Sequence, residues 1–334
     1  MNDNAINQVI NNYVRDNLSP KPEHRTYISA KYEALCALLG GGCFQSGSYA
    51  RFTAINPVHD LDIIYVVRDP TIKLDPRRFM EALAAKIKNS GIPGIKDVQV
   101  QTHSVTIIFD DGDADFSIDV VPALELMERN IYHEPLYEVP EILKFNPHNR
   151  VYRYQNAAVR PISWVKTDPR GYIHAASALN DANSNFRHAI KFGKGWRHFC
   201  KMAYEDDFKF KSFHFEQMFF RFFTDHPGVS TTDAIIACLG AVPTALEQPQ
   251  FKDRANDKVF IDEYVRELDG KQKSLIVKLQ AEAYALAVRL PGAVNSDELH
   301  KMLNGILDVE RPKPAAVYTS ASTVIARPRQ PWAY

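Results

Sequence analysis

Residues 43–62, CFQSGSYARFTAINPVHDLD, carry the most informative motifs of the chain. This stretch holds a Gly-Ser pair, Gly47 and Ser48, and it ends in two aspartates, Asp60 and Asp62, that open an apolar run. A glycine lets a ligand come close to the backbone because it has no Cβ. A serine placed where a turn becomes a helix adds its hydroxyl to free backbone N–H groups, and together these groups hold phosphate oxygens. The Gly-Ser pair therefore predicts a phosphate site.

The two aspartates predict a metal site beside the phosphate site. Side chains alternate across a strand, so Asp60 and Asp62 share one face while Leu61 and Ile63 share the other. Paired carboxylates next to bound phosphates suit Mg²⁺, which takes oxygen ligands from the protein and from substrate phosphates. The alternative, that both are ordinary surface carboxylates, is disfavoured because they head an apolar strand.

A third aspartate belongs to the same predicted site. Residues 116–121 form an apolar strand interrupted only by Ser117 and Asp119, and burying an unpaired carboxylate is costly. The economical interpretation is that Asp119 joins Asp60 and Asp62 as a metal ligand. A second Asp-x-Asp at 113–115 falls in a predicted Asp-Gly hairpin turn, where aspartates are favoured for local hydrogen bonding, so we do not assign it to the metal.

Composition limits the classes of function. The 334-residue chain is 45% hydrophobic and 24% charged, with a formal net charge of zero. The chain therefore has no overall positive charge that would indicate a large nucleic-acid partner. The four cysteines are widely spaced and are interpreted as small buried hydrophobes in a reducing cytosol. The N-terminus lacks a signal pattern and no apolar run approaches membrane-spanning length, so we expect a soluble, cytoplasmic protein without a membrane partner.

Hydrophobic periodicity predicts an α+β protein with a mixed sheet in its N-terminal half and helices in its C-terminal half. Strands are expected at 98–109 and 116–121 besides those of the motif, and the stretch from 125 to 170 is expected to be irregular. The predicted helices cover residues 3–17, 24–40, 76–89, 176–204, 213–223, 233–246, 258–268, 272–290 and 296–307.

The change in pattern predicts three units. Residues 1–165 would be a catalytic core with N-terminal helices, residues 166–311 a helical nucleotide-binding domain, and residues 312–334 a Pro-rich tail without a periodic face. A cleft between the first two units is the natural place for the active site.

The order Gly-Ser, a dozen residues, Asp-x-Asp, and later a lone Asp on a strand resembles the polymerase-beta-type nucleotidyltransferases. More narrowly, it resembles the bacterial cyclic-oligonucleotide synthases of anti-phage signalling, relatives of oligoadenylate synthase, over roughly residues 25–225. The resemblance implies a polymerase-beta-like core that condenses nucleoside triphosphates into a cyclic di- or trinucleotide second messenger. It also implies two Mg²⁺ ions, replaceable by Mn²⁺, held by Asp60, Asp62 and Asp119.

The C-terminal half contains further matches to this family. Lys194-Gly195-Trp196 resembles the Lys-x-Trp of the oligoadenylate-synthase relatives, which implies that Lys194 binds the triphosphate together with Gly47 and Ser48. Ser212-Phe213 resembles their Ser-Tyr step, which implies a phosphate contact for the serine and a base-stacking platform for the phenylalanine. Stacking on an aromatic ring contributes about 1–3 kcal/mol and tolerates different bases.

Simpler interpretations of these residues stay open. Lys194 lies three residues after Lys191 and could belong to a solvated helix face, Ser212 could be a helix N-cap, and Phe213 could be a core residue in a Phe-rich helix. Relatives often have glycine where this chain has Phe52, which bears on the shape of the loop after the Gly-Ser pair.

Two other classes of function compete with the synthase. One is a linear nucleotidyltransferase acting on RNA or a small-molecule acceptor, and the other is a non-catalytic nucleotide sensor on the same fold. The neutral charge disfavours a large RNA acceptor, and the presence of all three aspartates disfavours a sensor. The chain lacks a His/Cys insertion of the kind that animal GMP-AMP synthase uses to grip DNA, so no DNA activator is predicted. The tail could bind a regulatory protein partner.

Overall fold

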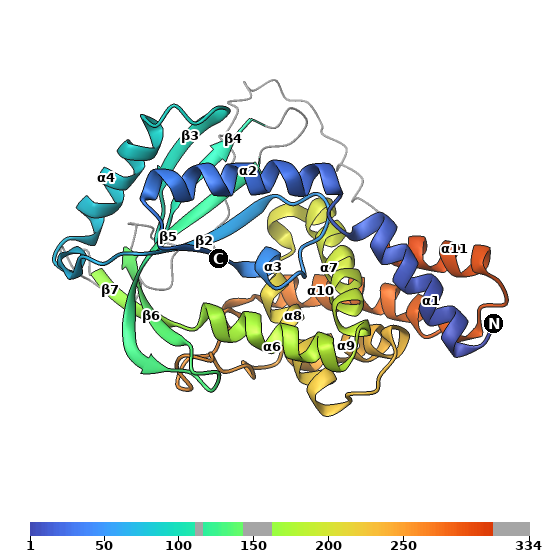
Figure 1. The fold of residues 1–334 in the computed structure, drawn as a ribbon. Coiled ribbons are helices and arrows are strands. Elements are labelled where there is room, and N and C mark those ends of the chain that lie inside the picture. Colours follow the sequence, from blue (N-terminus) through green and yellow to red (C-terminus); the bar gives the residue numbers. More distant parts are fainter. Residues whose placement is uncertain (111–115, 143–161, 310–334) are drawn as a thin grey trace, which may run out of the picture.

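A mixed sheet runs through the N-terminal half of the chain (Figure 1). The computed structural model describes residues 1–110, 116–142 and 162–309. In spatial order the sheet contains β1 (Cys43–Ser46), β2 (Asp60–Val66), β5 (Phe116–Arg129), β4 (Val105–Phe109) and β3 (Ile95–Val100). Strands β2 and β5 are parallel and their other pairings are antiparallel. The far half of β5 also pairs with β6 (Pro135–Ile142), which pairs with β7 (Ile162–Thr167).

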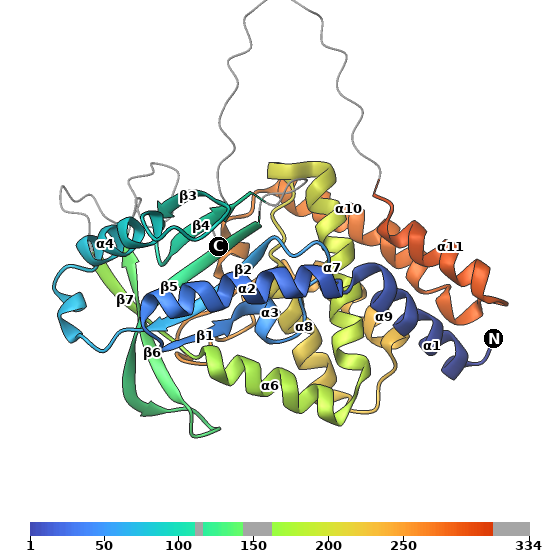
Figure 2. The same ribbon diagram turned by 45° about the horizontal axis from the view of Figure 1, so that its top comes forward.

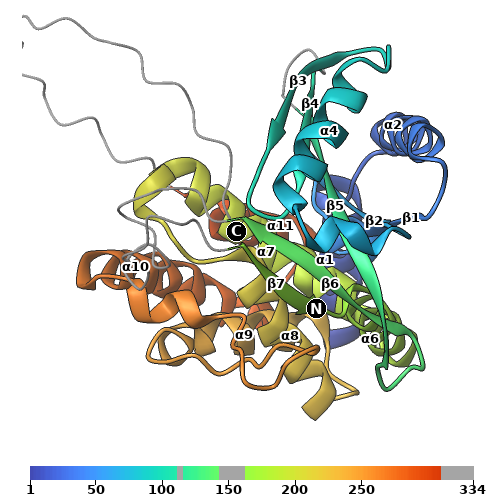
Figure 3. The same ribbon diagram turned by 90° about the vertical axis from the view of Figure 1, so that its left-hand side faces the viewer.

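Two helices cover one face of this sheet, α2 (Pro22–Leu39) and α4 (Pro76–Lys88). Helix α2 ends at Gly40, which adopts the left-handed conformation that glycine tolerates best. A buried cluster between helices and sheet includes Leu61 and Ile63 of β2. Because side chains alternate along β2, this packing leaves Asp60 and Asp62 on the opposite face. In Figure 3, α2 and α4 lie on one side of the sheet and the helical half lies on the other.

A second, larger apolar cluster holds the helical half together. Its helices are α6 (Pro169–Ala182), α7 (Asn185–Tyr204), α8 (Ser212–Asp225), α9 (Thr231–Ala245), α10 (Gly270–Ala287) and α11 (Ser296–Leu307). The N-terminal segment belongs to this cluster as well, through α1 (Asp3–Tyr13) and the π-helical turn η1 (Val14–Leu18). Figure 2 shows α1 beside α9 and α11. The proposed division of the chain near residue 165 must therefore allow for residues 3–18 packing with the C-terminal helices.

The prediction of irregular structure over residues 125–170 is wrong for the described part of that range. Strand β5 continues to Arg129, and β6 and β7 extend the sheet. Pro135, Pro140 and two glutamates interrupt the apolar alternation of β6, although Tyr137 and Val139 are buried in it. Proline is tolerated at a strand's first residue and on edges, so its presence did not exclude a strand here.

Two helix predictions in the C-terminal half also need correction. The helix expected over 176–204 is divided into α6 and α7 at Asn183, whose side chain donates to the carbonyls of Pro227 and Val229. The helix expected over 258–268 reduces to the 3₁₀ turn η4 (Glu263–Glu267). Just before it, the buried Asp262 carboxylate accepts hydrogen bonds from the backbone N–H groups of residues 250 and 251, which favours a loop over a longer helix.

The remaining elements are short. They are the helix α3 (Gly47–Ala50) and the 3₁₀ turns η2 (Pro70–Lys73), η3 (Glu205–Asp207) and η5 (Leu290–Gly292). No helix within the three described ranges combines the length and apolar character that crossing a membrane requires. The predicted turn at 110–113, the Asp-x-Asp at 113–115 and the tail at 312–334 lie outside the described residues, wholly or in part.

Candidate active site

The parallel pairing of β2 and β5 brings the predicted aspartates to neighbouring strands. In this register Asp62 lies opposite Asp119, and Asp60 lies opposite Ser117. Residues directly opposite one another on paired strands point to the same face of the sheet. All three aspartates therefore lie on the face that α2 and α4 leave uncovered, which we call the catalytic face.

The turn at Gly47 packs directly against one of these aspartates. Gly47 follows β1, whose last residue, Ser46, pairs with Asp62. A Cβ added to Gly47 would lie 1.7 Å from Oδ2 of Asp62, and Gly47 has a φ of +65°. Only glycine combines that conformation with so close an approach. The Gly-Ser pair thus adjoins the aspartates, and Ser48 lies in the first turn of α3.

The third aspartate is held by hydroxyl groups from the next strand. Thr106 of β4 lies opposite Asp119, and the hydroxyls of Thr106 and Ser104 both donate to Oδ1 of Asp119. Burial raises the pKa of the Asp119 carboxyl above its ordinary value, and the nearby charge of Asp60 acts in the same direction; the two hydroxyl donors oppose this rise. Oδ2 of Asp119 accepts no hydrogen bond from the described residues.

The chemistry of these donors fits a hard divalent cation, since they are oxygen atoms of carboxylates and hydroxyls. The metal-ligand role of the three aspartates stays a prediction. Among the residues that the structure describes, no group of three or more His, Cys, Asp or Glu side chains is placed to hold a metal ion. The carboxylates have separate neighbours, because Asp62 rests against Gly47 while Asp119 turns toward the hydroxyls of β4.

A buried glutamate connects the loop after the Gly-Ser pair to the helical half. Oε1 of Glu216, on α8, accepts hydrogen bonds from Nε of Arg51 at 2.6 Å and from the Thr53 hydroxyl at 2.9 Å. Oε2 accepts from Nζ of Lys194, on α7, at 3.4 Å. All four residues are buried. We call this set the Glu216 cluster.

The charges of the Glu216 cluster hold the glutamate ionised. Burial alone raises the pKa of Glu216, but the charges of Arg51 and Lys194 and the hydrogen bonds from Arg51 and Thr53 outweigh it, so the pKa lies at about 2. Burial lowers the pKa of Lys194, and neighbouring Arg51 lowers it further. A buried charge in this position is stable only while its partners remain, because an uncompensated charge in a protein interior is strongly unfavourable.

The predicted triphosphate ligand Lys194 is therefore not on a solvated helix face, since its side chain is only 8% exposed. Other cations of the same helix stripe also face the N-terminal half. Lys191 donates to the Ser19 hydroxyl at 3.0 Å, and burial with nearby cationic charge lowers its pKa to about 8. Arg187 donates to the carbonyl of Arg51 at 3.2 Å. The solvated-face interpretation of this stripe is wrong for Lys194.

The predicted residues of α8 lie at its first turn. Ser212 is the first residue of the helix, its side chain provides no N-cap bond, and its hydroxyl has no hydrogen-bond partner among the described residues. Phe213 is half-buried and packs edge-on to Tyr172 at 5.2 Å between ring centroids. The guanidinium of Arg51 lies 5.1 Å from the Phe213 ring centroid, so this ring borders the Glu216 cluster.

The loop after α3 explains why glycine would suit position 52. Phe52 has a φ of +60°, a left-handed conformation that costs a residue with a side chain about 1–2 kcal/mol. Its ring is 58% exposed, and the guanidinium of Arg187 lies 4.8 Å from its centroid. The backbone here thus keeps the shape that glycine favours, although the side chain differs.

Comparison with known proteins bears on this arrangement. Residues 18–141, which include β1, α3, β2 and β5 with all three aspartates, match the model of the Second Messenger Oligonucleotide or Dinucleotide Synthetase domain. This segment of the chain is thus similar to that synthetase domain. A search of the curated proteins gave no match.

Solved structures are similar to this chain through the helical half as well as the sheet. The Escherichia coli MS115-1 CdnC, in its complex with HORMA-deltaN, is similar over 90% of this chain and 96% of its own, with a TM-score of 0.66 and 17% identity. Bradyrhizobium diazoefficiens CdnG, in complex with GTP, is similar over 91% of this chain and 98% of its own, with a TM-score of 0.61 and 13% identity. Vibrio cholerae DncV, in complex with the linear intermediate 5′ pppA(3′,5′)pG, is similar over 90% of this chain and 96% of its own, with a TM-score of 0.61 and 11% identity. The polymerase-beta-like α+β fold is thereby confirmed.

Sequence reasoning missed three polar residues that adjoin the site. Ser104 and Thr106 alternate at the start of β4, where small hydroxyl residues on one face of an apolar strand indicate a polar partner on the next strand. Glu216 is the only acidic residue between Phe213 and Phe223. A lone carboxylate in so apolar a helix predicts a buried cation partner.

Proposed function

We propose that this protein is a nucleotidyltransferase that joins nucleoside triphosphates into a cyclic di- or trinucleotide, which serves as a second messenger in anti-phage signalling. The observation that carries the proposal is the register of Asp62 with Asp119 on the catalytic face, directly beside Gly47. Phosphate-binding backbone and carboxylates adjoin there, as transfer of a nucleotidyl group requires. The similarity to CdnC, CdnG and DncV supports the fold of this proposal.

Asp60, Asp62 and Asp119 would hold two Mg²⁺ ions, for which Mn²⁺ can substitute. Bound in this way, the ions supply charge neutralisation at the phosphates and make the attacking ribose hydroxyl more acidic. Asp119 lies on the acceptor side in this proposal, and its free Oδ2 would receive the hydroxyl proton. The backbone at Gly47 and the hydroxyl of Ser48 would hold the phosphates of the donor nucleotide.

Residues of α7 and α8 would complete the nucleotide site. The unbonded hydroxyl of Ser212 is available to the terminal phosphate, and the half-buried ring of Phe213 to the donor base. Lys194 would act through its charge, which adds to the positive potential of Arg51 beside the phosphates. Direct contact between Lys194 and the triphosphate would require its ammonium group to leave Glu216.

A product assay tests this proposal. The full chain is incubated with all four nucleoside triphosphates and Mg²⁺ or Mn²⁺, treated with phosphatase, and the surviving products are identified by mass spectrometry. The proposal expects a phosphatase-resistant cyclic product that is absent from Asp60→Ala/Asp62→Ala protein. Asp297→Ala protein is the matched control, because Asp297 is exposed in the first turn of α11, outside the site. Linear products, or transfer to added RNA, would instead favour a linear nucleotidyltransferase, and nucleotide binding without any product would favour a sensor.

The cellular role is tested separately. We propose that the protein acts in the cytoplasm on nucleoside triphosphates, without a DNA activator or a membrane partner, and that residues 312–334 bind a regulatory protein. Phage should form fewer plaques on bacteria that carry the wild-type gene with its neighbouring genes than on bacteria that carry the Asp60→Ala/Asp62→Ala form. Equal plaque numbers would contradict the antiviral role while leaving the chemistry intact. Cyclic product that appears only when DNA is added would contradict the absence of a DNA activator.

A further inference from the structure

A chamber lies at the far end of the catalytic face, where the proposed reaction does not use it. Its volume is about 680 Å³, and its lining includes Phe44, Val66, Arg68, Lys73, Tyr137 and Arg170. None of the three aspartates lines it, nor does Gly47 or Ser48. A volume of this size is typical of small-molecule sites. We call it the Arg68 chamber.

The chamber is separate from the aspartates but shares two strands with them. Along β2, Val66 lies four residues beyond Asp62, a distance of about 13 Å at the rise of an extended strand. Between them lies Ile64, buried in a small apolar cluster with Ala123 and Val139. The packed apolar residues therefore separate a ligand in the chamber from a nucleotide at the aspartates.

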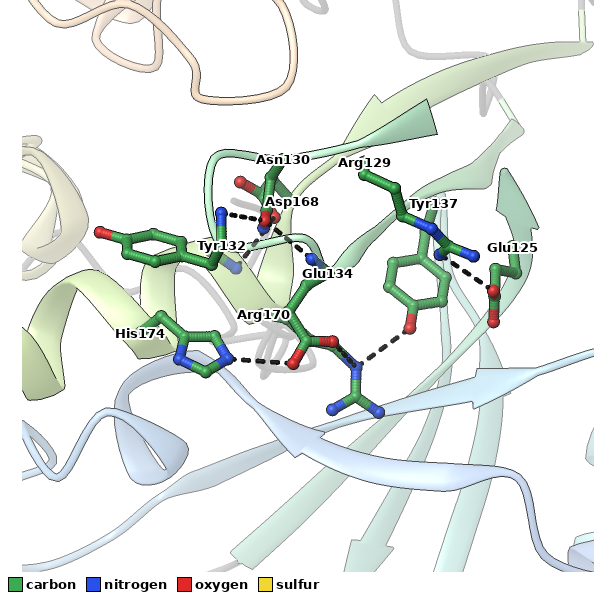
Figure 4. Close-up of polar contacts among 10 residues, drawn as sticks. Glu125, Arg129, Asn130, Tyr132, Glu134, Tyr137, Asp168, Arg170 and His174 are labelled. Carbon is green, nitrogen blue, oxygen red and sulfur yellow. Dashed lines mark hydrogen bonds and ion pairs between the residues drawn. The ribbon is translucent and has the colours of Figure 1, made fainter. Parts of the chain in front are cut away.

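Arg170 forms part of the wall of the chamber. It comes from the first turn of α6, and its guanidinium lies 4.1 Å from the centroid of the Phe44 ring. Its Nε donates to the Tyr137 hydroxyl at 3.1 Å and lies 3.7 Å from Glu134 (Figure 4). The side chain thus spans the sheet face from β1 to β6, while its two terminal nitrogens make no hydrogen bond with described residues.

The charges of the lining favour an anion. Lys73 pairs with Glu138 at 2.5 Å, and Glu125 pairs with Arg129 at 3.2 Å, so these charges are already balanced. Arg68 is exposed and has no ion pair or hydrogen bond with any described residue. Arg170 is within ion-pair distance of Glu134, so Arg68 carries the unpaired positive charge among the described residues of the lining, and the terminal nitrogens of Arg170 add hydrogen-bond donors that no described residue uses. Planar guanidinium forks bind phosphate and carboxylate oxygens bidentately.

Occupancy of the chamber has a direct path to the phosphate turn. Phe44 and Gly47 are three residues apart, on β1 and at its end, and the backbone of Val66 donates to the carbonyl of Gly42 at 2.8 Å. Strands β1 and β2 continue from there to the pairing of Ser46 with Asp62. A ligand that moves Arg170 or Phe44 would thus act on the strand that positions Gly47.

From these observations we propose that the Arg68 chamber is a second ligand site for a small oxyanion-bearing molecule of nucleotide size, and that its occupancy regulates the catalytic face. The ligand carries a phosphate or carboxylate group held by Arg68 and Arg170. The existence of the site does not depend on the proposed function, whereas the regulatory part of the inference rests on it.

Binding to the full chain tests the site without relying on activity. Isothermal titration with ATP, GTP, inorganic pyrophosphate and citrate is carried out in EDTA, on wild-type protein and on the Asp60→Ala/Asp62→Ala form. We expect at least one probe to bind both proteins, and binding to weaken at least tenfold in Arg68→Ala and in Arg170→Ala. Arg78→Ala is the matched control, because Arg78 is exposed on α4, outside the chamber. Binding of the phosphate probes identifies a phosphorylated ligand, and binding of citrate alone identifies a carboxylate.

Two results would overturn the site. In the first, no probe binds. In the second, binding is indifferent to Arg68→Ala, or is lost in the aspartate variant, which would place the probe at the catalytic site. The coupling is measured by amide hydrogen exchange of residues 43–48, which should slow when the bound probe is present in wild type and remain unchanged in Arg68→Ala. Unchanged exchange in wild type would remove the regulatory part of the proposal. The product assay then decides the proposed function independently.

Discussion

Gly47 is the residue whose backbone the catalytic face can least replace. We expect Gly47→Ala to lower nucleotidyl transfer at least 100-fold, because its Cβ would occupy the position of Oδ2 of Asp62, at 1.7 Å. The matched control is Gly91→Ala. Gly91 has a similar φ of +73° but nothing within 4 Å of its Cβ position, so it carries only the backbone strain, about 1–2 kcal/mol. Initial rates and thermal unfolding of both variants check this. Equal activity losses in the two would show that strain, not the contact with Asp62, matters.

Thr106 is expected to act on the reaction through Asp119. Thr106→Val keeps the shape of the side chain but removes the hydroxyl that donates to Asp119. Loss of such a supporting hydrogen bond typically lowers metal affinity or activity about 10–100-fold. We expect a higher Mn²⁺ concentration for half-maximal activity, with little change in melting temperature. Thr26→Val, at an exposed position of α2, is the control. A purely structural role would lower the melting temperature and leave the Mn²⁺ dependence unchanged.

At this scale the sequence predicted identities better than contacts. Strand alternation was sufficient to place Asp60 and Asp62 on one face of the sheet. An isolated charge in an apolar strand was sufficient to predict that Asp119 lies on the same face. The partners of these groups come from segments distant in sequence. Ser104 and Thr106 reach Asp119 only through the pairing of β4 with β5, and periodicity within a strand carries no information about which strand lies next to it.

At the scale of elements, the Glu216 cluster links the loop after α3 to α7 and α8. We expect Glu216→Gln to lower the free energy of unfolding by about 3–5 kcal/mol at neutral pH, because it leaves Arg51 and Lys194 buried without a counter-charge. The pKa of Glu216 is about 2 in the folded protein, whereas the ordinary value for glutamate is 4.5. A lowered carboxyl pKa contributes stability above the unfolded value, and this contribution is lost as the pH falls through the folded value.

The acid dependence gives this prediction a specific signature. The difference in free energy of unfolding between wild type and Glu216→Gln should be constant above about pH 5 and shrink from about pH 4.5 to 2. Urea unfolding at several pH values measures it. Glu298→Gln, which removes a half-buried carboxylate near the start of α11, is the control. A difference that does not depend on pH in this window would mean that Glu216 contributes by packing and not by charge.

Element types were predictable where one face of an element is apolar and its interior lacks proline. Helices α2, α4 and α11 meet this condition and match their predicted ranges within a few residues. Strand β6 does not, because Pro135, Pro140 and two half-buried glutamates break its alternation, and its place in the sheet depends on pairing with β5 and β7. Such long-range pairing is a tertiary effect that overrides local propensity.

The whole molecule is built on two apolar clusters. One joins α2 and α4 to the sheet, and the other joins α1 and η1 to the C-terminal helices. The order of segments along the chain does not reveal this, since α1 precedes α2 yet packs with the other cluster. Amphipathic periodicity identifies an apolar face but does not specify what covers it.

Paired substitutions test whether the clusters are separate units of stability. Ile10 of α1 and Ile28 of α2 are both fully buried, one in each cluster. Truncation of a buried isoleucine to alanine costs about 2–5 kcal/mol, so Ile10→Ala and Ile28→Ala are matched in chemistry and differ only in location. Partial unfolding raises amide exchange within the cooperative unit that it opens.

We therefore expect Ile10→Ala to increase amide hydrogen exchange in α7, α9 and α11 while β2 and β5 keep their protection, and Ile28→Ala to give the reverse pattern. Exchange measured by mass spectrometry at peptide resolution distinguishes the two. If both variants raise exchange uniformly, the molecule unfolds as one unit, and the Glu216 cluster together with the contacts of α6 on β1 joins the halves too strongly for either to open alone. Separate patterns would assign residues 3–18 to the helical unit and move the first unit's start to α2.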